Sequence, residues 1–162
     1  MRTETVHVLL VEDDLRFVAL LEAWLETTAE AVGRRQGMSL RMQHVGDLAT
    51  ALSSLDAIPF DVVLADLNLP DSHGLATCER ILGHTAGVPV IILSGIDDED
   101  LAIQAMGRGA QDYLVKGLLD ERLLLRSVRY ALERSRLQQE LGQMRQVQLQ
   151  GYWSSLIPAS TA

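Results

Sequence analysis

Asp66 is the residue of this sequence that most needs a chemical explanation. It follows the apolar run 62–65, which has the composition of a buried strand, and a proline and a glycine come soon after it. An unpaired charge at the end of a buried strand is costly, so Asp66 needs partners. Glu12 and Asp13 follow another apolar run and supply carboxylates. Converging carboxylates repel one another unless a cation is present, and an all-oxygen ligand set suits Mg²⁺.

Two further runs end in side chains that complete a reactive set. Ser94 closes the run 88–94 with a hydroxyl group, and Lys116 lies near the end of the run 111–117. A carboxylate, a divalent cation, a hydroxyl and an ammonium group together predict phosphoryl transfer to an aspartate, with an acyl phosphate as product. In that chemistry Mg²⁺ and Lys116 neutralise the phosphoryl oxygens, and Ser94 donates a hydrogen bond to one of them.

The elements that must position these residues alternate along the chain. Five short apolar runs predict strands, and the three most apolar are typical of central parallel strands covered on both faces. These runs span residues 6–11, 39–45, 61–66, 88–94 and 111–117. Helical periodicity fills residues 14–32, 47–55, 74–83 and 97–107, and a fifth helix begins near Asp120.

Strands that alternate with helices predict a parallel α/β sheet with right-handed crossovers. Five such units favour a flavodoxin-like, doubly wound sheet with strand order 2-1-3-4-5, in which the alternating run 39–45 is an edge strand. Ligands of such sheets bind beyond the carboxyl ends of the strands, at the switch point between strands 1 and 3. Asp66 and the acidic pair of Glu12 and Asp13 stand at the ends of those two strands.

The sequence resembles the receiver domain of two-component response regulators over about residues 6–131. The matching segments are VLLVEDD, DVVLADLNLPDSHG, PVIILSG and GAQDYLVKG, in the order and spacing of that family. Any one segment alone is a weak signal, whereas four in register are specific.

The resemblance implies a role for each candidate residue. Asp66 is the phosphoacceptor, Lys116 and Ser94 act on the phosphoryl group, and Ser94 and Tyr113 form the switch pair. The Mg²⁺ ligands that it implies are Asp13, Asp66, the backbone carbonyl of Asn68, and Glu12 through water. His73 lies in the same loop, but magnesium prefers oxygen ligands, which favours a surface role for this histidine.

One departure from the family pattern keeps a second interpretation open. Gly117 follows the lysine where the family usually has proline. A cis peptide bond without proline costs roughly 2.5–4 kcal/mol relative to trans. The geometry after Lys116 is therefore open, and a degenerate receiver that binds partners without phosphorylation is the alternative.

The expected function is a regulatory switch rather than a metabolic enzyme. A sensor histidine kinase or a histidine phosphotransfer protein donates a phosphoryl group to Asp66 with Mg²⁺, and the domain catalyses its own phosphorylation and slow hydrolysis. Ser94 and Tyr113 then rearrange, and the face formed by the fourth helix, fifth strand and fifth helix changes its partners. A phosphatase of the haloacid-dehalogenase type uses a similar nucleophile, but it places Asp-x-Asp after its first strand.

Composition excludes several kinds of binding partner and several cellular locations for this protein. The 162 residues carry a net charge of -8, which argues against general binding to nucleic acid or to an anionic membrane. A single cysteine excludes an intrachain disulfide, and no apolar run approaches the length of a membrane span. The opening residues lack the pattern of a secretory signal, so the expected location is cytoplasmic.

The last third of the sequence predicts a helix that continues past the receiver domain. We divide the chain into an N-terminal lead (1–5), the receiver domain (6–131), a helical extension (132–150) and a tail (151–162). Along this helix, four- and three-residue steps connect Tyr130, Leu137, Leu141 and Met144, and Arg134 interrupts this imperfect heptad. Residues 120–150 would either link to an effector domain or pair in a homodimer. The chain is either a fragment or a stand-alone receiver whose helix docks on a partner.

Overall fold

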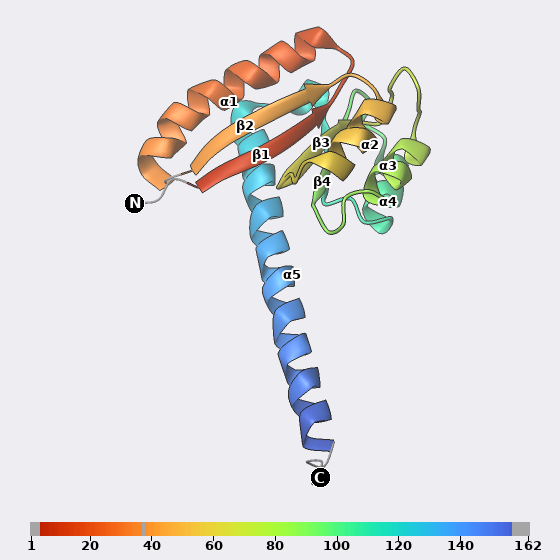
Figure 1. Cartoon of the computed structure of the whole chain (residues 1–162). Helices are drawn as coiled ribbons and strands as arrows, with labels where there is room; N and C mark the ends of the chain where they lie inside the picture. The colour runs from red at the N-terminus through yellow and green to blue at the C-terminus, as the bar shows by residue number, and fades with distance from the viewer. Residues whose placement is uncertain (1–3, 37, 157–162) are drawn as a thin grey trace.

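The computed structural model describes residues 4–36 and 38–156, and its elements follow the predicted alternation (Figure 1). The strands are β1 (Glu4–Val11), β2 (Met38–Val45), β3 (Val62–Asp66), β4 (Val90–Ser94) and β5 (Asp112–Val115). The helices are α1 (Leu15–Gln36), α2 (Leu48–Ala57), α3 (Leu75–Leu82), α4 (Glu99–Gly107) and α5 (Glu121–Leu156), with a short 3-10 turn at Lys116–Leu118. The strands form one parallel sheet in the order β2-β1-β3-β4-β5, which confirms the predicted flavodoxin-like topology.

The sheet has a hydrophobic core on each face because successive strand residues point to opposite sides. Leu9 of β1 packs in a cluster with residues of α2, α3 and α4, such as Ile81. Leu10, the next residue, packs in a second cluster with residues of α1 and α5, such as Leu124. Every residue of β3 is buried. Full burial of each such aliphatic side chain contributes about 1.5–3 kcal/mol, so the core holds the strand ends in fixed positions.

Aspartates precede four of the helices, among them Asp120, which accepts from the backbone N–H of Leu123 at 2.8 Å at the start of α5. Asp14 accepts a hydrogen bond from the backbone N–H of Arg16, at 3.0 Å, just inside α1. Asp47 caps α2 by accepting from the N–H of Thr50 at 2.7 Å, and Asp98 caps α4 in the same manner. Each cap satisfies a backbone donor that the helix leaves without a partner. These caps set where the chain turns from each strand end into the next helix.

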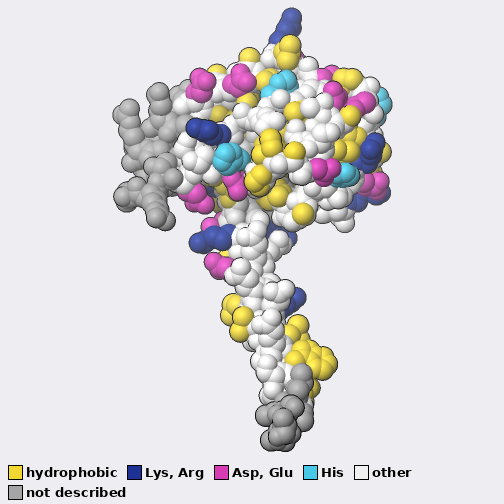
Figure 2. All heavy atoms as spheres, in the orientation of Figure 1, with side chains coloured by type: hydrophobic (Ala, Val, Ile, Leu, Met, Phe, Trp, Pro, Cys, Tyr) yellow, Lys and Arg dark blue, Asp and Glu magenta, His cyan; other side chains and the backbone are white. Residues whose placement is uncertain are grey.

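The helix α5 belongs to the receiver fold only in its first part. Leu124, Val128 and Ala131 are buried against the sheet, and beyond them α5 projects from the domain as a shaft (Figure 1). Figure 2 shows hydrophobic side chains on the lower part of that shaft.

The helix also continues further than predicted. The sequence indicated an end near Gln150 and a tail from Gly151, whereas α5 reaches Leu156, and the last part of the predicted tail, 157–162, lies outside the described residues. A glycine inside a helix costs only about 1 kcal/mol, and the many strong helix formers around Gly142 and Gly151 outweigh it. None of the helices in the described ranges has an apolar stretch long enough to cross a bilayer.

Candidate phosphoacceptor site

The ends of β1 and β3 bring the predicted carboxylates together. Val11 and Ala65 are paired across the two strands, so the residues that follow them, Glu12 and Asp66, end neighbouring strands. Carboxylate oxygens of Glu12, Asp13 and Asp66 lie within 4.8 Å of one another. Glu12 and Asp66 are buried, whereas Asp13 is exposed. The cluster is therefore held by the sheet on one side and open on the other.

Lys116 joins this cluster from the far end of β5, and it is the only lysine in the sequence. Its Nζ donates to Glu12 Oε2 at 2.6 Å and to Asp66 Oδ2 at 2.8 Å. It also lies 4.6 Å from the centroid of the Phe17 ring. Burial by itself lowers the pKa of the Lys116 amine, but the hydrogen bonds to Asp66 and Glu12 outweigh this and raise it overall. Lys116 is therefore a cation at neutral pH.

Glu12 is committed to contacts within the protein. Its side chain is 0% exposed, and its Oε1 accepts from the backbone N–H of Asp14 at 3.1 Å. Burial raises the pKa of the Glu12 carboxyl, and the hydrogen bond from Lys116 offsets part of this rise. With both carboxylate oxygens already occupied, Glu12 fits the predicted indirect role at a metal better than direct ligation.

The loop after Lys116 answers the question that Gly117 raised. None of the peptide bonds between described residues is cis. Lys116 and Gly117 instead begin the short 3-10 turn that follows β5. The lysine reaches both carboxylates from this all-trans backbone, so the absence of proline does not keep it from the site.

The loop that follows Asp66 is tied down at several points. The backbone N–H of Asn68 donates to Asp66 Oδ1 at 2.9 Å, and Gly74 adopts a positive φ of 64° at the start of α3. Further along the loop, the carboxylate of Asp71 accepts from the N–H groups of Leu48 and Ala49 at 2.8 and 3.0 Å. These two hydrogen bonds hold the pKa of Asp71 below its ordinary value. The loop is thus attached to the start of α2.

Ser94 and Tyr113 both bond to the backbone of one residue, Ile96, in the loop between β4 and α4. Asp66 is paired with Leu93, which places Ser94 at the next strand end beside the cluster. The buried Ser94 Oγ accepts from the backbone N–H of Ile96 at 3.2 Å. The Tyr113 hydroxyl donates to the backbone carbonyl of the same Ile96 at 2.9 Å. Both predicted switch residues are therefore connected to a single loop residue.

The donor set of this site fits magnesium. The three clustered side chains offer only carboxylate oxygens, which are the hard ligands that Mg²⁺ prefers. The exposure of Asp13 leaves room for the water molecules that Mg²⁺ retains. Asp13 is the exposed member of the cluster. Direct ligation of an ion by Asp13, by Asp66 and by the backbone carbonyl of Asn68 stays a prediction.

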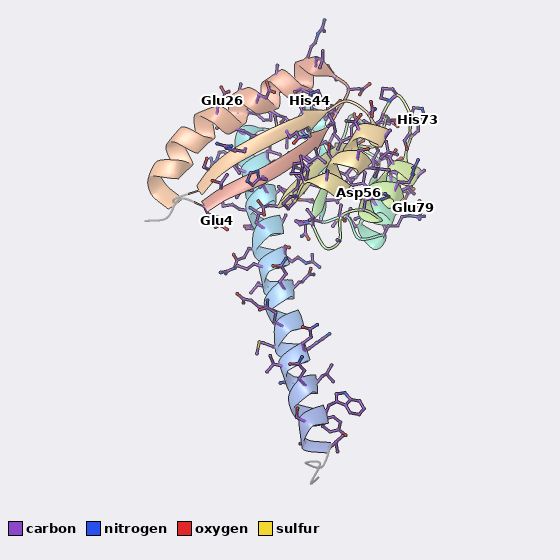
Figure 3. All side chains as sticks on the ribbon, in the orientation of Figure 1. Glu4, Glu26, His44, Asp56, His73 and Glu79 are labelled. Atoms are coloured by element: carbon purple, nitrogen blue, oxygen red, sulfur yellow. The ribbon has the colours of Figure 1, made fainter. Side chains whose placement is uncertain are left out.

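Three residues around the site could not be identified as contributors from the sequence. Phe17 reads there as one more apolar residue of a helical face, yet its ring lies under Lys116. Asp71 has no local signal for capping a helix that begins 23 residues earlier in the chain. His44, labelled in Figure 3 at the end of β2, contacts the backbone carbonyl of Glu12 through its Nε2 at 2.7 Å. His73 is exposed on its loop, in agreement with the surface role that was predicted.

Comparison with known proteins decides the family. The family model for the response regulator receiver domain matches residues 8–129. This chain belongs to that family. The receiver domain accounts for all five strands and for the first part of α5, and the outer part of α5 lies beyond the matched residues.

Relatives of this receiver domain include much longer proteins. The transcriptional regulatory protein ZraR of Klebsiella oxytoca is 30% identical over 137 residues, which make up 85% of this chain but only 28% of ZraR. The chain thus spans less than a third of that relative's length.

Solved receiver domains have the same fold. The signal receiver domain of the putative Luxo repressor protein from Vibrio parahaemolyticus matches 87% of this chain and 98% of its own, with a TM-score of 0.69 and 25% identity. The receiver domain of the sensor histidine kinase PA1611 from Pseudomonas aeruginosa matches 80% of this chain and 98% of its own, with a TM-score of 0.65 and 24% identity. That structure was described with a magnesium ion coordinated in its active site cleft.

Proposed function

We propose that Asp66 accepts a phosphoryl group from a sensor histidine kinase or a histidine phosphotransfer protein, and that the added charge switches the partners of this domain. The observation that carries the proposal is the position of Lys116, whose ammonium group bridges Glu12 and the Asp66 carboxylate. A cation held at that place is suited to neutralise charge that develops on a transferring phosphoryl group.

The proposed reaction is an in-line displacement at phosphorus. One carboxylate oxygen of Asp66 forms a bond to phosphorus as the bond between phosphorus and the donor breaks, and the donor leaves with the electron pair of that bond. Asp13 and Asp66 would hold Mg²⁺, which would supply positive charge to the phosphoryl oxygens when bound. Lys116 neutralises a further oxygen, and the buried Glu12 keeps the amine in place through its 2.6 Å hydrogen bond.

The switch would operate through the backbone of Ile96. Ser94 Oγ accepts its present bond from the Ile96 N–H, so its own proton remains to be donated to a phosphoryl oxygen. A movement of Ser94 toward that oxygen would alter its bond to Ile96. Tyr113 holds the carbonyl of the same residue, so a movement of the loop changes the environment of this ring. The surface of α4, β5 and α5 then differs between the two states. The proposal includes the predicted cytoplasmic location and an output through residues 120–150, by way of an effector domain or a homodimer.

Intact mass after incubation with acetyl phosphate and Mg²⁺ tests this proposal. We expect the full chain to gain the mass of one phosphoryl group, and the Asp66→Asn variant to gain none. Asp56→Asn is the matched control, because Asp56 is an exposed carboxylate of α2 outside the cluster. Addition of EDTA should abolish the gain, and Lys116→Met should slow it on the order of a hundredfold.

The alternative function predicts a different pattern in the same experiment. A chain that binds Mg²⁺ but gains no phosphoryl group would contradict the switch and favour a receiver that binds partners without phosphorylation. A mass gain that persists in Asp66→Asn would place the acceptor at another residue and contradict the proposal as well.

A further inference from the structure

His44 contacts the backbone of the acidic pair from a strand that carries none of the carboxylates. Its half-buried ring places Nε2 2.7 Å from the backbone carbonyl oxygen of Glu12. The residue lies near the end of β2, the edge strand of the sheet, where Figure 3 labels it. A carbonyl oxygen accepts hydrogen bonds but cannot donate them, so Nε2 carries the proton and donates it.

This hydrogen bond stands where the backbone ladder between β1 and β2 ends. The N–H of Glu12 still donates to the backbone carbonyl of Val45, at 3.0 Å. In a parallel ladder the carbonyl of Glu12 would next accept from the N–H of Asp47. The chain turns away at that point, because Asp47 is the N-cap of α2. The ring of His44 therefore supplies the donor in place of the departing backbone.

The carbonyl of Glu12 belongs to the same rigid peptide group as the N–H of Asp13. A hydrogen bond that holds this carbonyl also fixes the direction in which the Asp13 side chain leaves the backbone. The carboxylate of Glu12 is held independently, by Lys116 and by the N–H of Asp14. Among residues 4–36 and 38–156, none donates a hydrogen bond to the carboxylate of Asp13. Its position therefore depends on the backbone that His44 holds.

A displaced Asp13 carboxylate would bind Mg²⁺ more weakly. This ion prefers nearly octahedral geometry with ligand oxygens at about 2.0–2.1 Å, so it tolerates little error in their position. Groups that orient metal ligands from outside the coordination sphere typically contribute roughly 10–100-fold to metal affinity. His44 acts on Asp13 through a peptide group, so we expect an effect near the lower end of that range.

We propose that His44 is a positioning residue of the Mg²⁺ site, which holds the peptide between Glu12 and Asp13 and thereby aims the Asp13 carboxylate. The inference rests on the Mg²⁺ site of the proposed function, but it does not require phosphoryl transfer. It gives the edge strand β2 a part in a site whose other residues stand at the ends of β1, β3, β4 and β5.

Isothermal titration of the full chain with magnesium chloride tests the proposal. His44→Leu lacks the donor and should bind Mg²⁺ roughly three- to tenfold more weakly than the wild type. His44→Gln offers an amide N–H at a similar reach and should bind Mg²⁺ within about twofold of the wild type. His44→Asn carries the same amide on a shorter side chain and should behave like leucine. This polar variant keeps the test decisive if leucine disturbs folding.

His84→Leu is the matched control. The ring of His84 contacts the backbone carbonyl of Arg80 at 3.2 Å, just after α3, so this substitution removes a bond of the same kind outside the carboxylate cluster. We expect the Mg²⁺ affinity of this variant to equal that of the wild type. Equal losses in His44→Leu and His84→Leu, or a glutamine variant that binds as weakly as leucine, would overturn the proposal.

The rate of phosphorylation by acetyl phosphate separates positioning from structural damage. His44→Leu should react at nearly the wild-type rate when Mg²⁺ is saturating, and more slowly only when Mg²⁺ is limiting. A rate that stays low at saturating Mg²⁺ would contradict a role confined to Asp13. If the wild type binds Mg²⁺ but gains no phosphoryl group, the proposed function fails and the affinities still decide the role of His44. A wild type that binds no Mg²⁺ would refute both.

Discussion

The carboxyl edge of the sheet buries charged side chains, whereas the outer half of α5 exposes apolar ones. At the sheet edge, the ion pairs of Lys116 lie between side chains that are 18% exposed or less. Along the outer half of α5, large apolar side chains are half-exposed or more, and Leu141 at 58% is typical. The first region is stabilised by contacts within the chain, and it positions chemistry. The second region has its apolar surface free for contacts with another molecule.

The helix α5 has a buried part and an exposed part, so buried and exposed side chains can be compared within one helix. Leu124 near its start is 0% exposed and packs with the residues of β4 and α1. Leu141 lies on the same helix and has the same helix propensity, so the two differ only in what surrounds them. If a substitution acts through the loss of buried contacts, it should affect Leu124 much more than Leu141. If it acts only through helix propensity, it should affect both leucines equally.

The largest effect is expected from the same substitution at both leucines. Leu124→Ala should lower the free energy of unfolding by about 3 kcal/mol or more, because it leaves a cavity in the core. Leu141→Ala should change it by less than about 0.5 kcal/mol in dilute solution, where no second copy is bound. Urea unfolding of the two variants at low protein concentration measures both values. Similar losses would mean that the outer half of α5 is held to the domain after all.

The same contrast explains what could be predicted from the sequence. The strand ends could be placed because apolar runs such as 62–65 stop at a carboxylate, and the alternation of elements fixed the order of the strands. The end of α5 was placed too early because Gly151 was taken as the stop, whereas glycine alone does not stop a helix of strong formers and the first proline after Gln150 is Pro158. The pattern of exposed residues on α5 was visible as an imperfect heptad, but its partner was not.

Within the site, the clustered residues such as Lys116 could be predicted from the sequence, whereas the hydrogen bonds and contacts that they form could not. Lys116 could be assigned to the cluster from its place at a strand end. Its bond to Glu12 joins residues 104 positions apart, and its contact with Phe17 depends on how α1 packs. Both follow from side-chain packing that no local pattern encodes. The attachment of Asp71 to the start of α2 is of the same kind.

A pH titration of Lys116 examines the paired charges at the sheet edge. Isotope labelling of lysine gives one side-chain NMR signal, because the sequence contains no other lysine. The pKa of this amine is raised from the ordinary value of 10.5, so the midpoint in the folded chain should exceed that in the urea-unfolded chain. A cation with a raised pKa stabilises the fold fully below its unfolded pKa, and this contribution is lost as pH rises through the folded pKa.

Glu12→Gln supplies the control for this titration. The variant removes one of the two carboxylates that raise the pKa of Lys116, so the midpoint should fall while the bond to Asp66 remains. The titration is recorded in EDTA so that no divalent cation competes for the carboxylates. A folded midpoint below the unfolded one would mean that burial of the amine outweighs its two hydrogen bonds, contrary to our assignment.

The smallest effect is expected from Phe17, which touches the site only through Lys116. Its ring is 9% exposed and lies 4.6 Å from the amine, within the range of a cation–π interaction. Phe17→Leu keeps most of the apolar volume but removes the ring face, and it should slow phosphorylation by acetyl phosphate about two- to fivefold. Phe17→Tyr keeps the ring face and should retain the wild-type rate.

A measurement of the affinity for Mg²⁺ distinguishes a role of Phe17 in positioning Lys116 from a general disturbance of the site. Phe17 contacts Lys116 and offers no oxygen ligand to a metal, so both variants should bind Mg²⁺ as the wild type does. A positioning role therefore predicts slower phosphorylation in Phe17→Leu alone, with unchanged metal affinity in all three chains. If leucine and tyrosine slow the reaction equally, the ring face contributes nothing, and Phe17 is one more core residue of the kind that its spacing in the sequence suggested.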